Sequence, residues 1–366
     1  MFQLASKQLL SRAAALSTAA AAGYALSSAS APASSDDATS SLRDFFPTPE
    51  SLYSRTADLQ CAVSGKTNSA FVFIKPHAAN SDAVKALVKA HFKKNGIRVT
   101  GEGALDAATI DENMYIDNHY GAIASKAMKL KPTELNVPAK GQAGFEKMFG
   151  ESWSEALAAG KVYNAKDACE KLGCDGAGLD AKWATLSRGE NLIKFGGGFY
   201  CGKVGDIYVM NGFYMSMRGS YTDQTSNGIH YFTVQWPTDT LSWADFRGEV
   251  LGATDPATAA EGSARRVIYE QWESLGLPGQ PNVGDNGVHA SASPFEAMAE
   301  RANWLGVDPE EDEFAKGMMA AGVSKETIAA WSSDPQTTCG GETGSLFDFL
   351  EDLDADDCLA KVRTIQ

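Results

Sequence analysis

A histidine, two nearby serines and a downstream glutamate form the pattern in this sequence that is best suited to nucleophilic chemistry. His289 stands in a short extended segment, and Ser293 and Pro294 follow as an N-cap and a first-turn proline of a helix. Glu300 lies less than two turns into that helix, so its carboxylate can reach back to one ring nitrogen of the histidine. The other ring nitrogen is then free to attack an electrophile. We therefore expect His289 to be a nucleophile whose tautomer is set by Glu300, assisted by Ser291.

The elements that must position these groups alternate between strands and helices. Hydrophobic periodicity together with capping and stop signals gives the order strand, helix, strand, helix, then two more strands and the helix that carries Glu300. This order predicts an α+β fold of the ferredoxin-like type, with an antiparallel sheet and flanking helices. The expected elements are a strand at 71–75, a helix from 81 to 95, a strand at 97–102, a helical stretch at 110–128, and strands at 229–236 and around 288.

A segment of about a hundred residues, 129–228, interrupts this order, and a connection this long usually carries its own structure. Its first half, 145–183, has helical spacing. Its second half predicts strands at 191–195, 200–204, 207–210 and 213–218, separated by glycine-containing turns. The sequence therefore predicts an inserted β-rich subdomain.

Several blocks outside this segment resemble the nucleoside diphosphate kinase family, and they occur in the order of that family. They cover most of residues 70–130 and 229–306. The blocks are the first strand ending in Lys75-Pro76, Asn118-His119-Tyr120, Leu251-Gly252-Ala253-Thr254, Gly262-Ser263-Ala264-Arg265, Val283-Gly284-Asp285-Asn286, and the stretch around His289.

The resemblance implies ping-pong transfer of a γ-phosphate from a nucleoside triphosphate to a nucleoside diphosphate, through a phosphohistidine at His289. Glu300 and Lys75 would be the other catalytic residues, and Mg²⁺ would bridge the phosphates of the di- and triphosphate substrates. The nucleotide- or phosphate-binding residues would be Lys75, Tyr120, Arg247, Thr254, Arg265, Val283, Asn286 and Ser291.

The chain also departs from the family pattern. Arg247 falls one position early for the second phosphate arginine, and His77 stands where the family has an acid. The aromatic residue that stacks on the base lies in the replaced segment, where Phe145 or Phe149 is the candidate. An alternative is therefore a catalytically weak or inactive kinase-like subunit that acts in the assembly of an organellar complex. The family usually forms hexamers or tetramers, so a homo-oligomer remains open, because the insertion could block those contacts or create new ones.

Composition and charge limit the partners. The formal net charge of −14 disfavours binding to nucleic acids and to anionic membranes, and no run is long and apolar enough to span a membrane. The six cysteines lack a zinc-type spacing, so we expect reduced thiols.

The two ends differ from the central part, 67–306, which we expect to form the kinase-like domain. Residues 1–35 contain Lys7 and Arg12 but no acid, as in an organellar presequence. We expect the mitochondrion, with a plastid and then the secretory pathway as alternatives. Residues 36–66 read as a linker. Residues 307–366 predict an acidic helical extension, with a loop at 335–344.

Overall fold

The computed structural model describes residues 67–196 and 198–365. The expected presequence (1–35) and linker (36–66) lie outside these residues. Within the described part of the chain, none of the helices combines the length and the apolar character needed to cross a membrane.

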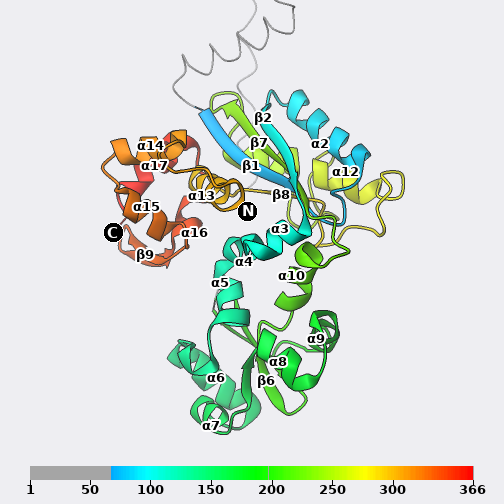
Figure 1. Cartoon of the computed structure of the whole chain (residues 1–366). Coiled ribbons are helices and arrows are strands. Elements are labelled where there is room, and N and C mark those ends of the chain that lie inside the picture. Colours follow the sequence, from blue (N-terminus) through cyan, green and yellow to red (C-terminus); the bar gives the residue numbers. More distant parts are fainter. Residues whose placement is uncertain (1–66, 197, 366) are drawn as a thin grey trace, which may run out of the picture. The chain divides into compact units, whose positions relative to one another are not determined.

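A four-stranded sheet forms the centre of the region around His289. It contains β1 (Thr67–Ile74), β2 (Arg98–Leu105), β7 (Ile229–Pro237) and β8 (Val288–Ala290), in the order β2-β7-β1-β8 (Figure 1). Every pairing in this sheet is antiparallel. This confirms the expected α+β class, and the two central strands are the first and third along the chain, as in a ferredoxin-like sheet. The pairing of β1 with β8 places Phe73 opposite His289.

Alternating side chains of β1 point to two different cores. Val72 and Ile74 pack with α2 (Asp82–Lys94), the π-helical turn η4 (Phe246–Leu251) and α12 (Ala264–Glu270). Phe71 and Phe73 pack on the opposite face, which is covered by α3 (Ala107–Glu112), α4 (Tyr115–His119) and α13 (Pro294–Leu305) (Figure 1). The short helix α11 (Trp243–Asp245) contributes Trp243 to the first of these cores. The short helical turns α5 (Gly121–Ala124), η2 (Ser125–Lys129) and η3 (Pro132–Glu134) lead into the segment 129–228, and Ala124 and Ala127 pack in a core with its helices.

The segment 129–228 contains its own sheet, but the β-rich prediction for it was wrong. Its helices hold more residues than its strands. The strands are β3 (Val162–Asn164), β4 (Leu192–Gly196), β5 (Phe199–Val204) and β6 (Ile207–Met210), in the order β3-β6-β5-β4. The helices are α6 (Ala139–Phe149), α7 (Trp153–Ala158), α8 (Ala165–Leu172), α9 (Gly176–Trp183) and α10 (Tyr214–Thr222).

Helix α10 accounts for the largest error in that segment, because a strand was expected at 213–218. Its aromatic residues suggested a strand, since aromatic side chains are common in sheets. In the structure Tyr214 and Tyr221 are both buried, and a spacing of seven residues places both on one face of a helix.

The C-terminal segment combines helices with a hairpin. It contains α14 (Glu313–Ala320), α15 (Lys325–Trp331), β9 (Gln336–Cys339), β10 (Glu342–Ser345), α16 (Leu346–Leu350) and α17 (Ala355–Val362). The loop expected at 335–344 is therefore an antiparallel hairpin, closed by two glycines with positive φ, Gly340 and Gly341. The segment shares a hydrophobic core with Phe295 and Met298 of α13, the helix that carries Glu300.

Candidate functional site

The imidazole of His289 is fixed from two sides. Its ring stacks on Phe73, with the ring centroids 4.5 Å apart, and its Nε2 lies 2.6 Å from Glu300 Oε1. Ser291 Oγ donates to the other oxygen of Glu300 at 2.5 Å. Ser293 caps α13 by accepting from the backbone N–H of Glu296, which sets the start of the helix. The remaining ring nitrogen of His289, Nδ1, makes no hydrogen bond with any described residue.

Burial controls the protonation of this pair. It holds the pKa of His289 well below its usual value, and the nearby charges of Lys75 and Arg265 add to the effect. Burial also raises the pKa of Glu300 to about 7, with His119 opposing the shift. At neutral pH the imidazole is therefore uncharged. When Glu300 is ionised its carboxylate accepts a hydrogen bond from Nε2–H, and the lone pair of the neutral His289 ring is then on Nδ1.

His119 completes the group behind the nucleophile, and the sequence reasoning did not include it among the site residues. Its ring meets that of His289 edge-on at 4.6 Å, and its Nδ1 lies 3.4 Å from Glu300 Oε1. Trp304 Nε1 donates to this Nδ1 at 3.3 Å, and burial lowers the pKa of His119 to about 3. The donor atoms of His119, His289 and Glu300 are close enough for a metal ion. Since Trp304 and Glu300 already engage two of the ring nitrogens, a neutral hydrogen-bonded group fits the contacts better.

His289 opens into a cavity of about 660 Å³. Most of the expected site residues line this one cavity, although they come from distant parts of the chain. Glu300 and Ser291 lie behind the histidine, outside the lining. The expected residues in the lining are Lys75, Tyr120, Arg247, Thr254, Arg265, Val283, Asn286 and His289.

Two of the cations in the cavity form no ion pair with any described carboxylate. Lys75 Nζ donates to the carbonyl of Gly284 at 2.7 Å, and burial followed by the charge of Arg265 lowers its pKa to about 8. Arg265 donates to the carbonyls of Val288 and Gly252, and burial followed by Arg247 lowers its pKa to about 10. A buried lysine and a partly buried arginine that form no ion pair with a described carboxylate favour an anionic ligand.

The backbone at Gly252 requires glycine. Its φ is +93°, and a Cβ there would lie 2.3 Å from the hydroxyl oxygen of Ser263. Both observations exclude a larger residue without local rearrangement. Gly252 therefore presents its carbonyl to Arg265 in a conformation that other residues rarely adopt.

Polar groups suited to a ligand lie beside these cations. Asn286 is 2% exposed and donates to the carbonyl of Thr254, while its own Oδ1 is buried and has no hydrogen-bond partner among the described residues. An unpaired buried acceptor is costly, so a hydroxyl donor from a ligand would stabilise it. Burial, followed by Glu300, raises the pKa of Tyr120 to about 12, so its hydroxyl remains a neutral donor at pH 7.

Arg247 lines the cavity but is already engaged by two carboxylates. Its Nη1 donates to Glu351 Oε1 at 2.8 Å and to Asp352 Oδ1 at 2.5 Å. Glu296 also lines the cavity, and burial followed by the charge of Glu300 raises its pKa to about 8. The sequence reasoning missed these three acids. For Glu296 the signal was its position one helical turn before Glu300, whereas no local signal marked Glu351 and Asp352.

The apolar side of the cavity differs from the expectation. Ile123, Phe213 and Met217 contribute to its lining, and Val283 at 56% exposure is its most exposed large hydrophobic residue. Phe145 and Phe149, the candidates for stacking on a base, do not line this cavity. They pack against each other in the core of the segment 129–228. The prediction for these two residues was therefore wrong.

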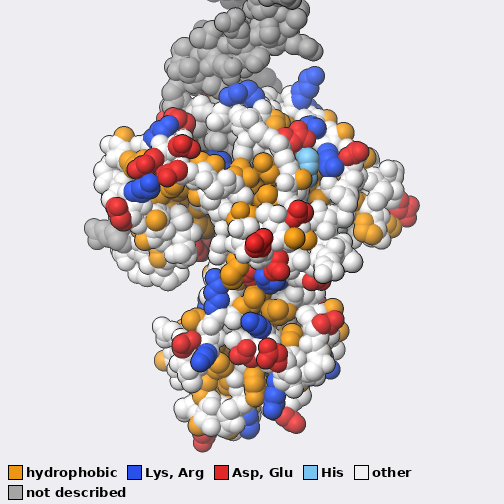
Figure 2. All heavy atoms as spheres, in the orientation of Figure 1, with side chains coloured by type: hydrophobic (Ala, Val, Ile, Leu, Met, Phe, Trp, Pro, Cys, Tyr) orange, Lys and Arg blue, Asp and Glu red, His pale blue; other side chains and the backbone are white. Residues whose placement is uncertain are grey.

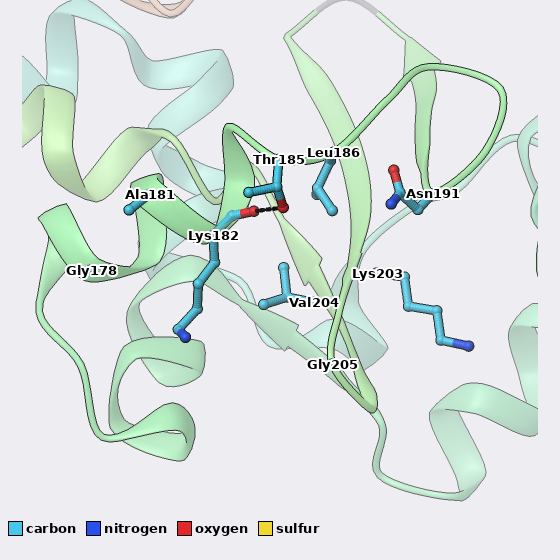
Figure 3. Close-up of a pocket in the computed structure, with 9 residues that line it drawn as sticks. All are labelled: Gly178, Ala181, Lys182, Thr185, Leu186, Asn191, Lys203, Val204 and Gly205. Atoms are coloured by element: carbon cyan, nitrogen blue, oxygen red, sulfur yellow. Dashed lines mark hydrogen bonds between the residues drawn. The ribbon is translucent and has the colours of Figure 1, made fainter.

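A second cavity, of about 480 Å³, lies within the segment 129–228 and lacks comparable chemistry (Figure 3). Lys182 and Lys203 are its charged residues, and their side chains point away from one another. Thr185 Oγ1 donates to the carbonyl of Lys182. On the face of the molecule drawn in Figure 2, acidic and basic side chains are interspersed. We therefore take the cavity at His289 as the candidate site.

Comparison with known proteins gives weak and partial similarities. A stretch of 57 residues, 16% of the chain, is 42% identical to nucleoside diphosphate kinases from Sinorhizobium medicae and Rhizobium meliloti. The match spans 33% of the length of each of these curated relatives. The crystal structure of an NDP kinase from Pyrobaculum aerophilum matches 65% of this chain and 95% of its own, at 16% identity and a TM-score of 0.32. No protein-family model matches the chain.

Proposed function

We propose that this protein is a nucleoside diphosphate kinase that works through a phosphohistidine at His289. One observation carries the proposal. Glu300 holds Nε2 of His289 and leaves Nδ1 without a partner among the described residues, in a cavity where Lys75 and Arg265 form no ion pair with a described carboxylate. The partial sequence similarity to nucleoside diphosphate kinases supports the same class of reaction.

The residues of the site can perform both halves of a ping-pong transfer. The lone pair on Nδ1 attacks the γ-phosphorus of a nucleoside triphosphate, and the bond from that phosphorus to the β–γ bridging oxygen breaks. The diphosphate leaves with the electron pair, while the positive charge that develops on the imidazole is stabilised by the carboxylate of Glu300. In the second half, a terminal oxygen of another diphosphate attacks the same phosphorus, and the N–P bond breaks. Neutral His289 is thereby regenerated.

Four of the lining residues have roles in this scheme. Lys75 and Arg265 bind the negative oxygens of the transferred phosphate, and Tyr120 donates a hydrogen bond to the phosphates. The unpaired Oδ1 of Asn286 can accept from a sugar hydroxyl. Mg²⁺, when bound to the nucleotide, supplies neutralisation of the phosphate charge and needs few protein ligands.

Labelling with γ-labelled ATP tests the proposal directly. The purified protein should acquire a label that is labile in acid and stable in base, since phosphohistidine has both properties. Adding a diphosphate with a different base should then discharge the label into the corresponding triphosphate. The absence of label, or a label that survives acid, would contradict a phosphohistidine route.

A second candidate function is a catalytically weak or inactive kinase-like subunit that acts in assembly. The observation in its favour is that Arg247, an expected phosphate ligand, is engaged by Glu351 and Asp352. Nucleotide binding without labelling would favour this second candidate over the first.

The pH dependence of kcat/KM should be bell-shaped. Activity should fall as the pH decreases through about 7, because Glu300, with its pKa raised to about 7, then gains a proton and no longer accepts from Nε2. It should also fall as the pH rises through about 8, because Lys75, with its pKa lowered to about 8, then loses its charge. Glu300→Gln should lower the plateau roughly 10- to 100-fold and remove the acid limb. The alkaline limb serves as the internal control, and an acid limb that persists in this variant would exclude Glu300 as its source.

A further inference from the structure

Two acids from the C-terminal segment stand inside the same cavity as His289. Glu351 and Asp352 directly follow α16, and both line the cavity together with Lys75 and Arg265. Both carboxylates accept from the same nitrogen, Nη1 of Arg247. The side chains are 45% and 47% exposed, so solvent and ions reach them. Arg247, a cation of the candidate phosphate site, is therefore already paired with carboxylates of the protein itself.

The backbone around the acid pair is held in place by buried contacts. Asp352 donates its N–H to the carbonyl of Ala292 at 2.9 Å, three residues after the nucleophile. Asp354 Oδ1 accepts from Asn68 Nδ2 at 2.6 Å and from the backbone N–H of Trp243 at 2.8 Å. Asn68 is fully buried and also accepts from the backbone N–H of Ala355. These contacts join residues 352–355 to β1, to α11 and to the segment between β8 and α13, so the two carboxylates stay near Arg247.

The cavity is therefore electrostatically divided. Lys75 and Arg265 form no direct ion pair with a described carboxylate, and Asp285 acts on Lys75 only as a nearby charge that raises its pKa, whereas Arg247 pairs with two carboxylates. A phosphate chain that reaches Arg247 meets two negative charges next to a single positive charge. A divalent cation on the phosphate oxygens removes two negative charges from the ligand and can interact favourably with the same carboxylates. Repulsion by the acid pair thus acts mainly on the free nucleotide.

We propose that Glu351 and Asp352 are specificity-determining residues that make the cavity select the divalent-cation complex of a nucleotide over the free nucleotide anion. The proposal rests on the proposed function in one respect, namely that the cavity binds nucleotide phosphates. It does not depend on phosphoryl transfer, because the selection takes place on binding.

Equilibrium binding of ADP, measured by calorimetry with Mg²⁺ or with EDTA, tests this selection. The unaltered protein should bind the Mg²⁺ complex more tightly. In the double variant Glu351→Gln/Asp352→Asn, free ADP should bind about tenfold more tightly, while binding of the Mg²⁺ complex should change less. A matched control is Glu311→Gln/Glu342→Gln, which removes two exposed acids of the same segment that do not line the cavity. It should leave the preference unchanged.

Three results would overturn the proposal. They are an unchanged affinity for free ADP in the double variant, an equal gain in the control, and equal gains for free and complexed ADP. Thermal melting of each protein monitors folding. The single change Glu351→Gln is a milder variant, since Arg247 is the partner of that carboxylate among the described residues.

Binding of tripolyphosphate, with and without Mg²⁺, separates this proposal from the proposed function. Selective binding of tripolyphosphate without ADP binding would retain the acid pair's role and reject a nucleotide site, and failure to bind either anion would reject both.

Discussion

Replacing His289 with alanine should lower phosphoryl transfer by at least about 10⁴-fold, because a ping-pong route has no other acceptor for the phosphate. Loss of the ring removes the attacking Nδ1 and one of the hydrogen-bond partners of Glu300. The turnover of a triphosphate and a diphosphate with different bases gives the rate, and protein labelling gives the intermediate. The turnover and the phosphohistidine label should be lost together.

The matched control for this variant is His230→Ala. His230 lies in β7, its Nε2 is 2.9 Å from Glu102 Oε1, and it does not line the cavity. This control should keep its label and turnover. Acid-labile labelling that persists in His289→Ala would show that another residue is the nucleophile and would reject the proposed mechanism.

Lys75→Met should reduce kcat/KM by roughly 10²- to 10³-fold, since it removes a preorganised charge from the transferred phosphate. The same change should leave the melting temperature unchanged or raise it. Burial lowers the pKa of Lys75 from 10.5 to about 8, which means that the folded state disfavours the charged form. At pH 7 the buried charge therefore opposes folding, and methionine of similar length removes that cost.

Lys89→Met provides the comparison for Lys75→Met. Lys89 pairs with Glu102 and is 45% exposed, so both its activity and its stability should change little. A Lys75→Met protein that melts much earlier would mean that the lysine has mainly a structural role. Normal turnover in the Lys75→Met protein would show that Lys75 does not bind the transferred phosphate.

Local sequence signals predicted the elements around the histidine well. Ser293 and Pro294 mark the start of a helix, and the helix period then determines where Glu300 points. A strand was expected at 71–75, and the structure adds that Phe73 stacks on the imidazole of His289. These features depend on residues that are close in sequence, and each has a recognisable spacing.

Features that depend on distant parts of the chain were not predictable in this way. Helix α10 was read as a strand because Phe213 and Tyr214 favour strands when considered alone, and only the packing of Tyr214 and Tyr221 selects a helix. The pairing of Arg247 with Asp352 joins residues that are 105 positions apart. Neither hydrophobic periodicity nor a helix-capping residue indicates such a contact, because it arises only when the C-terminal segment folds onto α13.

Helix α13 has two sides, and this has a practical consequence for work with shortened versions of the protein. Glu300 supports the histidine, while Phe295 and Met298 are buried in the core shared with the C-terminal segment, where each such side chain contributes roughly 1.5–3 kcal/mol. Arg301, the next residue, donates to Asp312 and to the carbonyl of Ser69. Deletion of everything after residue 306 would expose the apolar side chains of Phe295 and Met298 to water and would remove the carboxylate that pairs with Arg301. Loss of turnover in such a fragment would reflect a destabilised helix α13. It would carry no information about which groups contact the nucleotide.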